Sequence, residues 1–157
     1  IGDFVGEAGQ PENIKKALKA LTGADEFQAV VSGFTLHHLD REQKQEAYKR
    51  IFALLATGGL LLNGDLYSYN SWDMTTYAAG YDQEFIRASF NQKREHAENQ
   101  EKENDFVRLR DLWINHYDND NILDSAEMQS QMLTDVGFSE TAIPFRYWQV
   151  GVLWARK

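Results

Sequence analysis

The stretch that decides the fold runs from residue 27 to residue 65 and reads FQAVVSGFTLHHLDREQKQEAYKRIFALLATGGLLLNGD. Residues 27–33 form an apolar run without polar alternation, which predicts a strand buried on both faces. Residues 40–56 follow as an amphipathic helix, with Asp40 in the capping position and Gln43 three residues later. A second apolar run, 60–65, comes directly after two glycines. Strand, helix and strand with tight turns form a βαβ unit, so the two strands are predicted to be parallel.

The flanking segments extend this pattern on both sides. Residues 11–22 have helical spacing between Pro11 and Gly23, which suit the first turn and the end of a helix. Residues 82–116 contain two apolar groups separated by a polar stretch, which indicates either two helices or one long helix with a solvated middle.

The end of the sequence predicts one more helix and two strands. Asp124 is expected to cap the helix, Met128 and Met132 to point inward, and Gly137 to end it. Strands are expected near 140–145 and 148–156. The connection between them is too short for a parallel crossover, so this pair is predicted to be antiparallel.

Composition excludes several classes of protein. The 157 residues carry a formal net charge of -8, which argues against a protein held to nucleic acid by bulk attraction to phosphates. The sequence contains no cysteine, which removes disulfides, thiolate zinc sites and cysteine nucleophiles. It shows no secretory signal and no apolar run long enough for a bilayer, so we expect a cytoplasmic protein without a membrane partner.

Candidate site residues follow the predicted strands, because ligands of doubly wound sheets bind beyond the carboxyl ends of the strands. The residues at three such ends are 2–4, 32–39 and 63–67. His37 and His38 give the strongest local signal, since imidazole titrates near neutral pH and serves as a general base or a substrate contact. The alternative is that both histidines shape the turn into the next helix. No metal site is predicted, because the histidines lack ligands at matching spacing.

These segments resemble a known family. Residues 27–65 are similar to the second half of class I S-adenosylmethionine-dependent methyltransferases, in the fourth strand, the LHHL turn, the helix, the Gly-Gly bend and the fifth strand. MLTDVGFSET (132–141) and FRYWQVGVLWARK (145–157) resemble the last helix and closing strands of that family. The resemblance implies a partial Rossmann-like α/β fold, with central parallel strands, flanking helices, a C-terminal antiparallel pair and a helical insertion. It also implies that residues 1–157 are one domain, the C-terminal portion of a methyltransferase domain, with 66–123 as a variable lid.

The resemblance further implies S-adenosylmethionine as cofactor and assigns roles by position. The cofactor would contact Asp3 and Phe4 at its adenine, and Ser32, Gly33 and Phe34 along its methionine part. Catalytic roles would fall to His37, Asp65 and Tyr67, and substrate contacts to His38, Trp72 and Tyr77.

The sequence departs from the family in two places and leaves alternatives open. The glycine-rich motif after the first strand is absent, as is the acidic residue that holds the ribose hydroxyls. The chain is therefore expected to be either a methyltransferase, whose activity as this fragment is an open question, or a non-catalytic interaction module. A nicotinamide-dependent dehydrogenase is disfavoured, because its glycine fingerprint is missing and the antiparallel ending is wrong for it.

Partners follow from the same features. The acidic surface favours a small-molecule or peptide acceptor, although a subgroup of the family that modifies transfer-RNA wobble uridines shares the LHHL pattern, which keeps a nucleic-acid acceptor open. We also expect a homodimer, in which a second copy covers the sheet edge left by missing strands.

Overall fold

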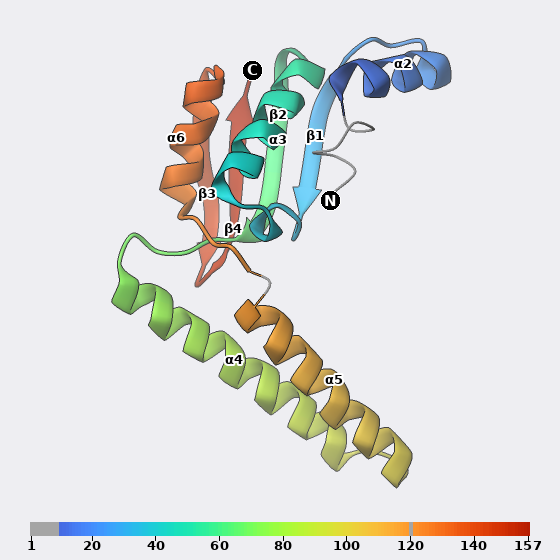
Figure 1. Cartoon of the computed structure of the whole chain (residues 1–157), viewed down its shortest axis with the longest axis vertical. Coiled ribbons are helices and arrows are strands. Elements are labelled where there is room, and N and C mark those ends of the chain that lie inside the picture. Colours follow the sequence, from blue (N-terminus) through green and yellow to red (C-terminus); the bar gives the residue numbers. More distant parts are fainter. Residues whose placement is uncertain (1–9, 120) are drawn as a thin grey trace. The chain divides into compact units, whose positions relative to one another are not determined.

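The computed structural model describes residues 10–119 and 121–157 and divides into two units (Figure 1). Of the described residues, 10–69 and 122–157 form the sheet unit, and 70–119 with Asn121 form the hairpin unit. The sheet unit contains α2 (Pro11–Thr22), β1 (Phe27–Gly33), η1 (Leu36–His38), α3 (Arg41–Leu54), β2 (Leu55–Leu66), α6 (Ala126–Val136), β3 (Glu140–Tyr147) and β4 (Val150–Arg156). The hairpin unit contains α4 (Trp72–Glu95) and α5 (Gln100–Asn119).

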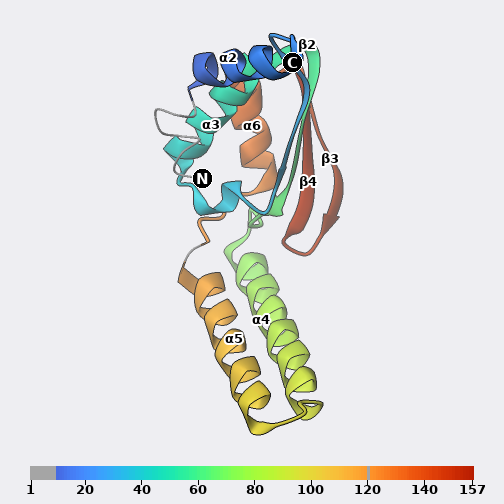
Figure 2. The same ribbon diagram turned by 90° about the vertical axis from the view of Figure 1, so that its right-hand side faces the viewer.

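The four strands of the sheet unit have the order β1-β2-β4-β3. β1 and β2 are parallel, with Val30 opposite Leu61, which confirms the predicted βαβ unit. β4 is antiparallel to both β2 and β3, which confirms the predicted closing pair. Helices α3 and α6 lie against one face of this sheet (Figure 2).

Helix α3 begins and ends for local reasons. The Asp40 side chain accepts from the Gln43 main-chain N–H at 2.8 Å, and the Gln43 side chain accepts from the Asp40 N–H at 3.0 Å, so the predicted capping box is present. The helix ends at Leu54, two residues before the predicted end, and β2 begins at Leu55. Gly58 has a φ of 75°, a conformation that glycine adopts without steric cost.

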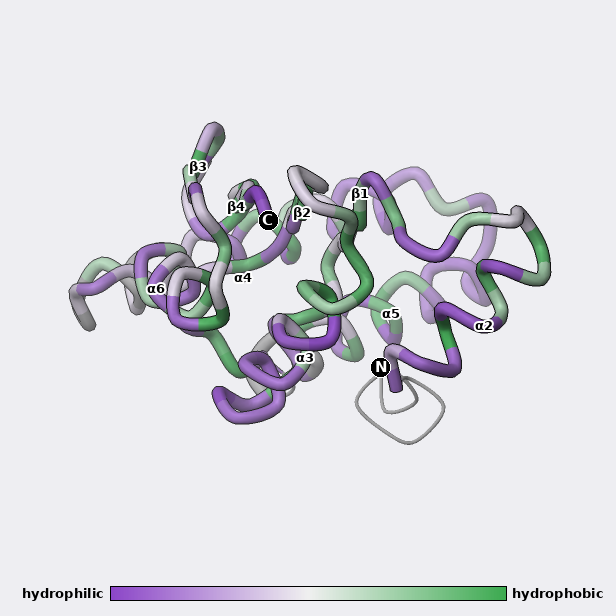
Figure 3. Tube along the Cα trace, turned by 90° about the horizontal axis from the view of Figure 1, so that it is seen from above, coloured by the Kyte–Doolittle hydropathy of each residue, from purple (hydrophilic) through white to green (hydrophobic). Residues whose placement is uncertain are grey.

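The core lies between the sheet and these two helices. Figure 3 shows hydrophilic residues recurring along α3, as expected for a helix with one buried side. The core residues come from α3, the strands, η1 and α6, and include Leu36, Leu39, Ala47, Tyr48, Ile51, Leu55, Leu61, Tyr67, Met132, Leu133, Phe138, Leu153 and Ala155.

Three details differ from the sequence predictions. β1 is an edge strand and the Val31 side chain is 75% exposed, so the strand is not buried on both faces. Ser125 caps α6, accepting from the Met128 N–H at 3.1 Å, whereas the Asp124 side chain is engaged with α3. Met128 is exposed, while Met132 is buried as predicted.

The hairpin unit settles the choice between one long helix and two. Helices α4 and α5 pack against each other, and Arg110 donates to the Asn91 side chain at 3.4 Å across the pair. Ser71 caps α4 through the Met74 N–H at 3.5 Å. None of the helices in the described ranges is long and apolar enough to cross a membrane.

Candidate functional site

The candidate site lies at the carboxyl ends of β1 and β2, where the chain leaves both strands. The Phe34 N–H donates to the Gly64 carbonyl at 2.8 Å, which carries the strand pairing one residue past β1. Phe34 has a φ of 47°, unusual for a residue with a side chain, and this turns the chain toward η1. The predicted residues from both strand ends, among them His37 and Asp65, are therefore brought together.

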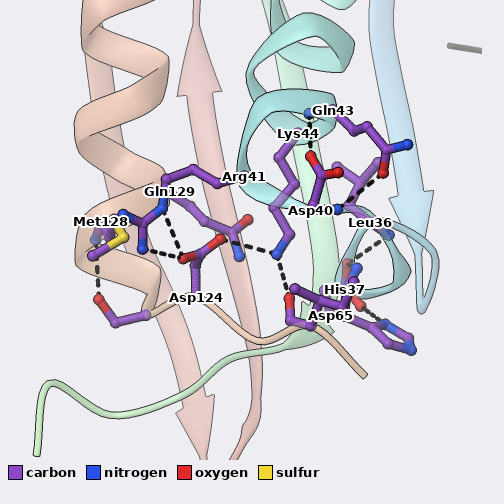
Figure 4. A network of polar contacts seen from close by, with 12 residues as sticks. Leu36, His37, Asp40, Arg41, Gln43, Lys44, Asp65, Asp124, Met128 and Gln129 are labelled. Atoms are coloured by element: carbon purple, nitrogen blue, oxygen red, sulfur yellow. Dashed lines mark hydrogen bonds and ion pairs between the residues drawn. The ribbon is translucent and has the colours of Figure 1, made fainter. Parts of the chain in front are cut away.

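Asp65 organises this turn from β2. Its Oδ2 accepts from the main-chain N–H groups of Leu36 at 2.9 Å and His37 at 3.2 Å. Its Oδ1 accepts from the Leu66 N–H at 3.0 Å and also contacts His37 Nδ1 (Figure 4). The side chain is completely buried. Three main-chain N–H groups therefore converge on this buried carboxyl group.

The pairing with Asp65 fixes the orientation of His37. An Asp65 carboxylate can only accept hydrogen bonds, so its contact with Nδ1 favours the His37 tautomer in which Nδ1 carries the proton and Nε2 has a lone pair. The same arrangement of a carboxylate behind an imidazole prepares histidine as a base in hydrolytic triads. His37 is 4% exposed, and its carbonyl accepts from the Ile122 N–H at 2.7 Å. His38 is partly exposed, with its ring centroid 3.9 Å from that of His37.

A hollow of about 290 Å³ adjoins the end of β1. Its lining comes from β1, the following turn and the inner side of α3, and comprises Val30, Val31, Ser32, Gly33, Thr35, Leu36, Leu39 and Ile51. A Cβ built on Gly33 would have no atom within 4 Å, so the absent side chain leaves open space here. Phe34 is 58% exposed. Ser32 and Gly33 thus line one hollow. They are two of the three residues assigned to the methionine part of a cofactor.

Tyr67 belongs to the interior below this site. Its hydroxyl donates to the Asn63 carbonyl at 2.8 Å and accepts from Asn63 Nδ2 at 3.1 Å. Burial, and after it the negative charge of Asp65, raises the pKa of the Tyr67 hydroxyl well above its ordinary value of 10.0. The hydroxyl therefore stays protonated and supports the end of β2.

The other predicted site residues lie outside the described residues or belong to the hairpin unit. Asp3 and Phe4 lie outside the described residues. Trp72 and Tyr77 belong to the first turns of α4, in the hairpin unit.

Sequence reasoning missed a polar network beside the site. Lys44 is fully buried and donates to the Ile122 carbonyl and, at 3.0 Å, to Asp124. Arg41 donates to the same carboxylate at 2.9 Å (Figure 4). A signal was present, because Lys44 lies three residues before Ala47 and four before Tyr48, on the buried stripe of α3.

Burial alone would raise the pKa of the Asp124 carboxyl. Hydrogen bonds and positive charges from Arg41 and Lys44 outweigh that effect and hold the pKa below its ordinary value of 3.8. Asp124 is therefore an ionised partner for both cations at neutral pH.

Comparison with known proteins gives a fold and no closer relationship. No family model matches the chain, and no curated protein matches it. Among solved structures, the S-adenosylmethionine-dependent methyltransferase SibL in its apo form is similar, with a TM-score of 0.54 and 11% identity over 93% of this chain and 40% of that one. Human N-acetylserotonin methyltransferase in complex with S-adenosylmethionine gives a TM-score of 0.51 and 12% identity, over 85% of this chain and 30% of that one. An O-methyltransferase family protein from Burkholderia thailandensis gives a TM-score of 0.51 and 16% identity, over 88% of this chain and 32% of that one.

These similarities show that the fold is part of a Rossmann-like methyltransferase fold, as the sequence predicted. The chain spans less than half the length of each of these three proteins.

Proposed function

We propose that this protein takes part in the transfer of a methyl group from S-adenosylmethionine to a hydroxyl group of a small-molecule or peptide acceptor. The observation that carries the proposal is the His37–Asp65 pair, placed at the carboxyl ends of two parallel strands in a methyltransferase-like fold. A hydroxyl must lose its proton on methylation, so an oriented base is useful for this acceptor. The name of the similar O-methyltransferase family protein supports the same class of acceptor.

The described residues fit one part of this cofactor. Ser32 and Gly33 line the hollow beside β1, and the open space over Gly33 admits a close approach to the main chain. These residues would hold the methionine part, with the ring of Phe34 next to them. When bound, S-adenosylmethionine supplies an electrophilic methyl group attached to a sulfonium. Asp3 and Phe4 stay the proposed contacts to its adenine.

His37 and Asp65 have distinct roles in this proposal. His37 Nε2 takes the proton from the acceptor hydroxyl, and Nδ1 keeps its own proton toward Asp65. The Asp65 carboxylate holds the ring in one tautomer and stabilises the imidazolium that forms. Tyr67 contributes by supporting the strand end that carries Asp65.

The first test is methyl transfer from radiolabelled S-adenosylmethionine to a panel of hydroxyl-bearing small molecules and peptides. His37→Gln keeps a side chain that can donate to Asp65 but has no base, so we expect kcat to fall by about 10²- to 10⁴-fold. The matched control is His96→Gln, because His96 is an exposed histidine at the end of α4. Equal turnover in both variants would remove His37 from the reaction.

The second test is calorimetric titration with S-adenosylhomocysteine. Gly33→Val adds a branched side chain to the lining of the hollow, so we expect it to weaken binding by at least about 10-fold. The same substitution at the exposed Gly80 of α4 is expected to leave binding unchanged. If the wild-type protein binds neither S-adenosylhomocysteine nor S-adenosylmethionine, the methyltransferase proposal is lost and a non-catalytic interaction module is favoured.

A further inference from the structure

The chain returns from the hairpin unit to the sheet unit at residues 122–125, directly beside His37. The Ile122 N–H donates to the His37 carbonyl at 2.7 Å, and the Ile122 carbonyl accepts from Lys44 Nζ. The main chain of Ile122 is therefore held on one side by the His37 turn and on the other by a buried ammonium. Two residues later, Asp124 accepts from the same ammonium at 3.0 Å.

The other side of the His37 turn is held by Asp65, through two main-chain N–H groups and the imidazole. Asp65 thus accepts from the His37 main-chain N–H, and the Ile122 N–H donates to the His37 carbonyl. Asp65 is fixed because it belongs to β2, which has a strand on each side. Ile122 belongs to no helix or strand, so its position depends on the residues that bind it.

Lys44 and Asp124 hold Ile122 in place. Lys44 has no exposed surface and Asp124 is 7% exposed, whereas Arg41 is 62% exposed at its side chain. An ammonium buried on the inner side of a helix is costly unless it is paired and hydrogen-bonded. Both of its partners shown here lie in the returning segment (Figure 4). An apolar residue would pack at this position of α3 without that cost, but it would not hold Ile122.

We propose that Lys44 is a positioning residue for His37, which it holds in place through the Ile122 carbonyl and the Asp124 carboxylate. In the described residues, the hydrogen bonds of Lys44 go to Ile122 and Asp124, and Lys44 is not among the residues that line the hollow beside β1. Its effect on His37 passes through the main chain of Ile122, whose carbonyl accepts from Lys44 and whose N–H donates to the His37 carbonyl. The inference rests on the proposed function of His37, and it adds a residue from α3 to the support that β2 gives.

The test uses Lys44→Met, which keeps the length of the side chain and removes the ammonium. Lys49→Met is the matched control, because Lys49 is an exposed lysine on the same helix. The first readout is the long-range ¹H–¹⁵N NMR spectrum of the imidazoles, which needs no cofactor. We expect the wild type and Lys49→Met to show His37 with a proton on Nδ1, and Lys44→Met to show shifted His37 nitrogen signals. Amide exchange at Ile122 is expected to accelerate by at least about 10-fold in Lys44→Met, as the segment opens more often.

The second readout is turnover. Displacement of a base by a fraction of an ångström lowers kcat by about 10- to 100-fold, with little change in the KM of the acceptor. Asp124→Asn keeps an oxygen that accepts from Lys44 but loses the charge, so its effects are expected to fall between those of Lys44→Met and Lys49→Met. Asp124→Asn also keeps the proposal testable if Lys44→Met fails to fold.

The positioning role would be overturned if the His37 signals and the Ile122 amide exchange were the same in Lys44→Met, Asp124→Asn and Lys49→Met. This holds even if the protein transfers methyl groups. If only Lys44→Met is unfolded, signals of Asp124→Asn that match those of Lys49→Met would overturn it equally. Shifted His37 signals in the variants, together with a wild-type protein that transfers no methyl group, would support the positioning role of Lys44 and reject the proposed function.

Discussion

The sheet unit and the hairpin unit use their apolar side chains in opposite ways. The sheet unit buries Leu61, Leu133 and Leu153 almost completely, and it also buries charged groups such as Lys44 and Asp65. In the hairpin unit, no residue whose side chain is described is buried, and Phe85 and Trp113 are more than half exposed. Two helices alone cannot enclose a core, whereas a sheet covered by helices can. The comparison places the stability and the proposed chemistry in the sheet unit, and leaves the hairpin with apolar surface available for contacts.

The largest difference between the units is expected from leucine truncation. Leu133→Ala removes a fully buried side chain from α6, so we expect the free energy of unfolding to fall by about 2 to 5 kcal/mol. Leu112→Ala in α5 removes a side chain that is 55% exposed and is expected to change it by less than about 0.5 kcal/mol. Urea unfolding followed by circular dichroism measures both. Similar losses in the two variants would show that the hairpin unit contributes as much buried core as the sheet unit.

A smaller contrast is expected from adding one methyl group to a glycine in each unit. A Cβ on Gly151 of β4 would lie 3.2 Å from the Phe145 carbonyl oxygen and 3.2 Å from a ring carbon of Tyr67, so Gly151→Ala should destabilise by about 1 to 3 kcal/mol. A Cβ on Gly80 of α4 would meet nothing within 4 Å, and alanine is the better helix former. Gly80→Ala should therefore stabilise its helix by up to about 1 kcal/mol.

Thermal unfolding of the two glycine variants gives the sign of each change. Opposite signs are expected, and a stabilised Gly151→Ala protein would show that β4 is less tightly packed than described.

The third prediction concerns how the ion pairs of Asp124 in the sheet unit respond to pH. The folded-state pKa of Asp124 lies below its ordinary value of 3.8, so its ion pairs stabilise the fold above that pH. This contribution is lost as the pH falls through the lowered folded-state pKa. We expect Asp124→Asn to cost about 1 to 2 kcal/mol at pH 7 and progressively less below pH 3.8.

Unfolding curves of wild type and Asp124→Asn over this pH range test the sign. Asp105→Asn in the hairpin unit is the control, because Asp105 pairs with Arg108 on the exposed surface of α5. A stability difference that grows on acidification would contradict the assignment.

The smallest effect is expected from removing the hairpin unit altogether. Ser68 and Ser125 form a parallel bridge, and the Ser68 N–H donates to the Asp124 carbonyl at 3.1 Å, so the two ends of the segment between them are adjacent. Replacing residues 71–120 with a short glycine-serine loop should change the stability of the sheet unit by less than about 1 kcal/mol. Urea unfolding measures this change, and loss of the dispersed NMR amide spectrum would show that the units fold together.

Much of the sheet unit could be predicted because local signals and tertiary structure agree. The capping box at Asp40 and the glycine after α6 are local features, and both are present. The short connection before β4 forced an antiparallel pair, because no crossover fits there.

The remaining features depend on residues distant in sequence. Asp124 and Ser125 are equally good helix caps, and the choice is made by Arg41 and Lys44, about 80 residues earlier. The exposure of Val31 depends on which face of the sheet the helices cover (Figure 2), and the seven residues of β1 do not encode that. Of the candidate site, the meeting of His37 with Asp65 followed from the predicted strand ends. The role of Lys44 did not, because a lysine is ordinarily read as solvent-facing.

The strand order also has a consequence for how the chain folds during synthesis. β4 lies between β2 and β3, although β2 precedes it by more than eighty residues. On a ribosome, β1 and β2 are therefore made long before the strand that closes the inner edge of β2. That edge stays open while the hairpin helices and α6 emerge, and such non-local pairing is slow to form. Nascent chains are consequently most prone to aggregate in this interval, and chaperone binding is expected to concentrate on β2.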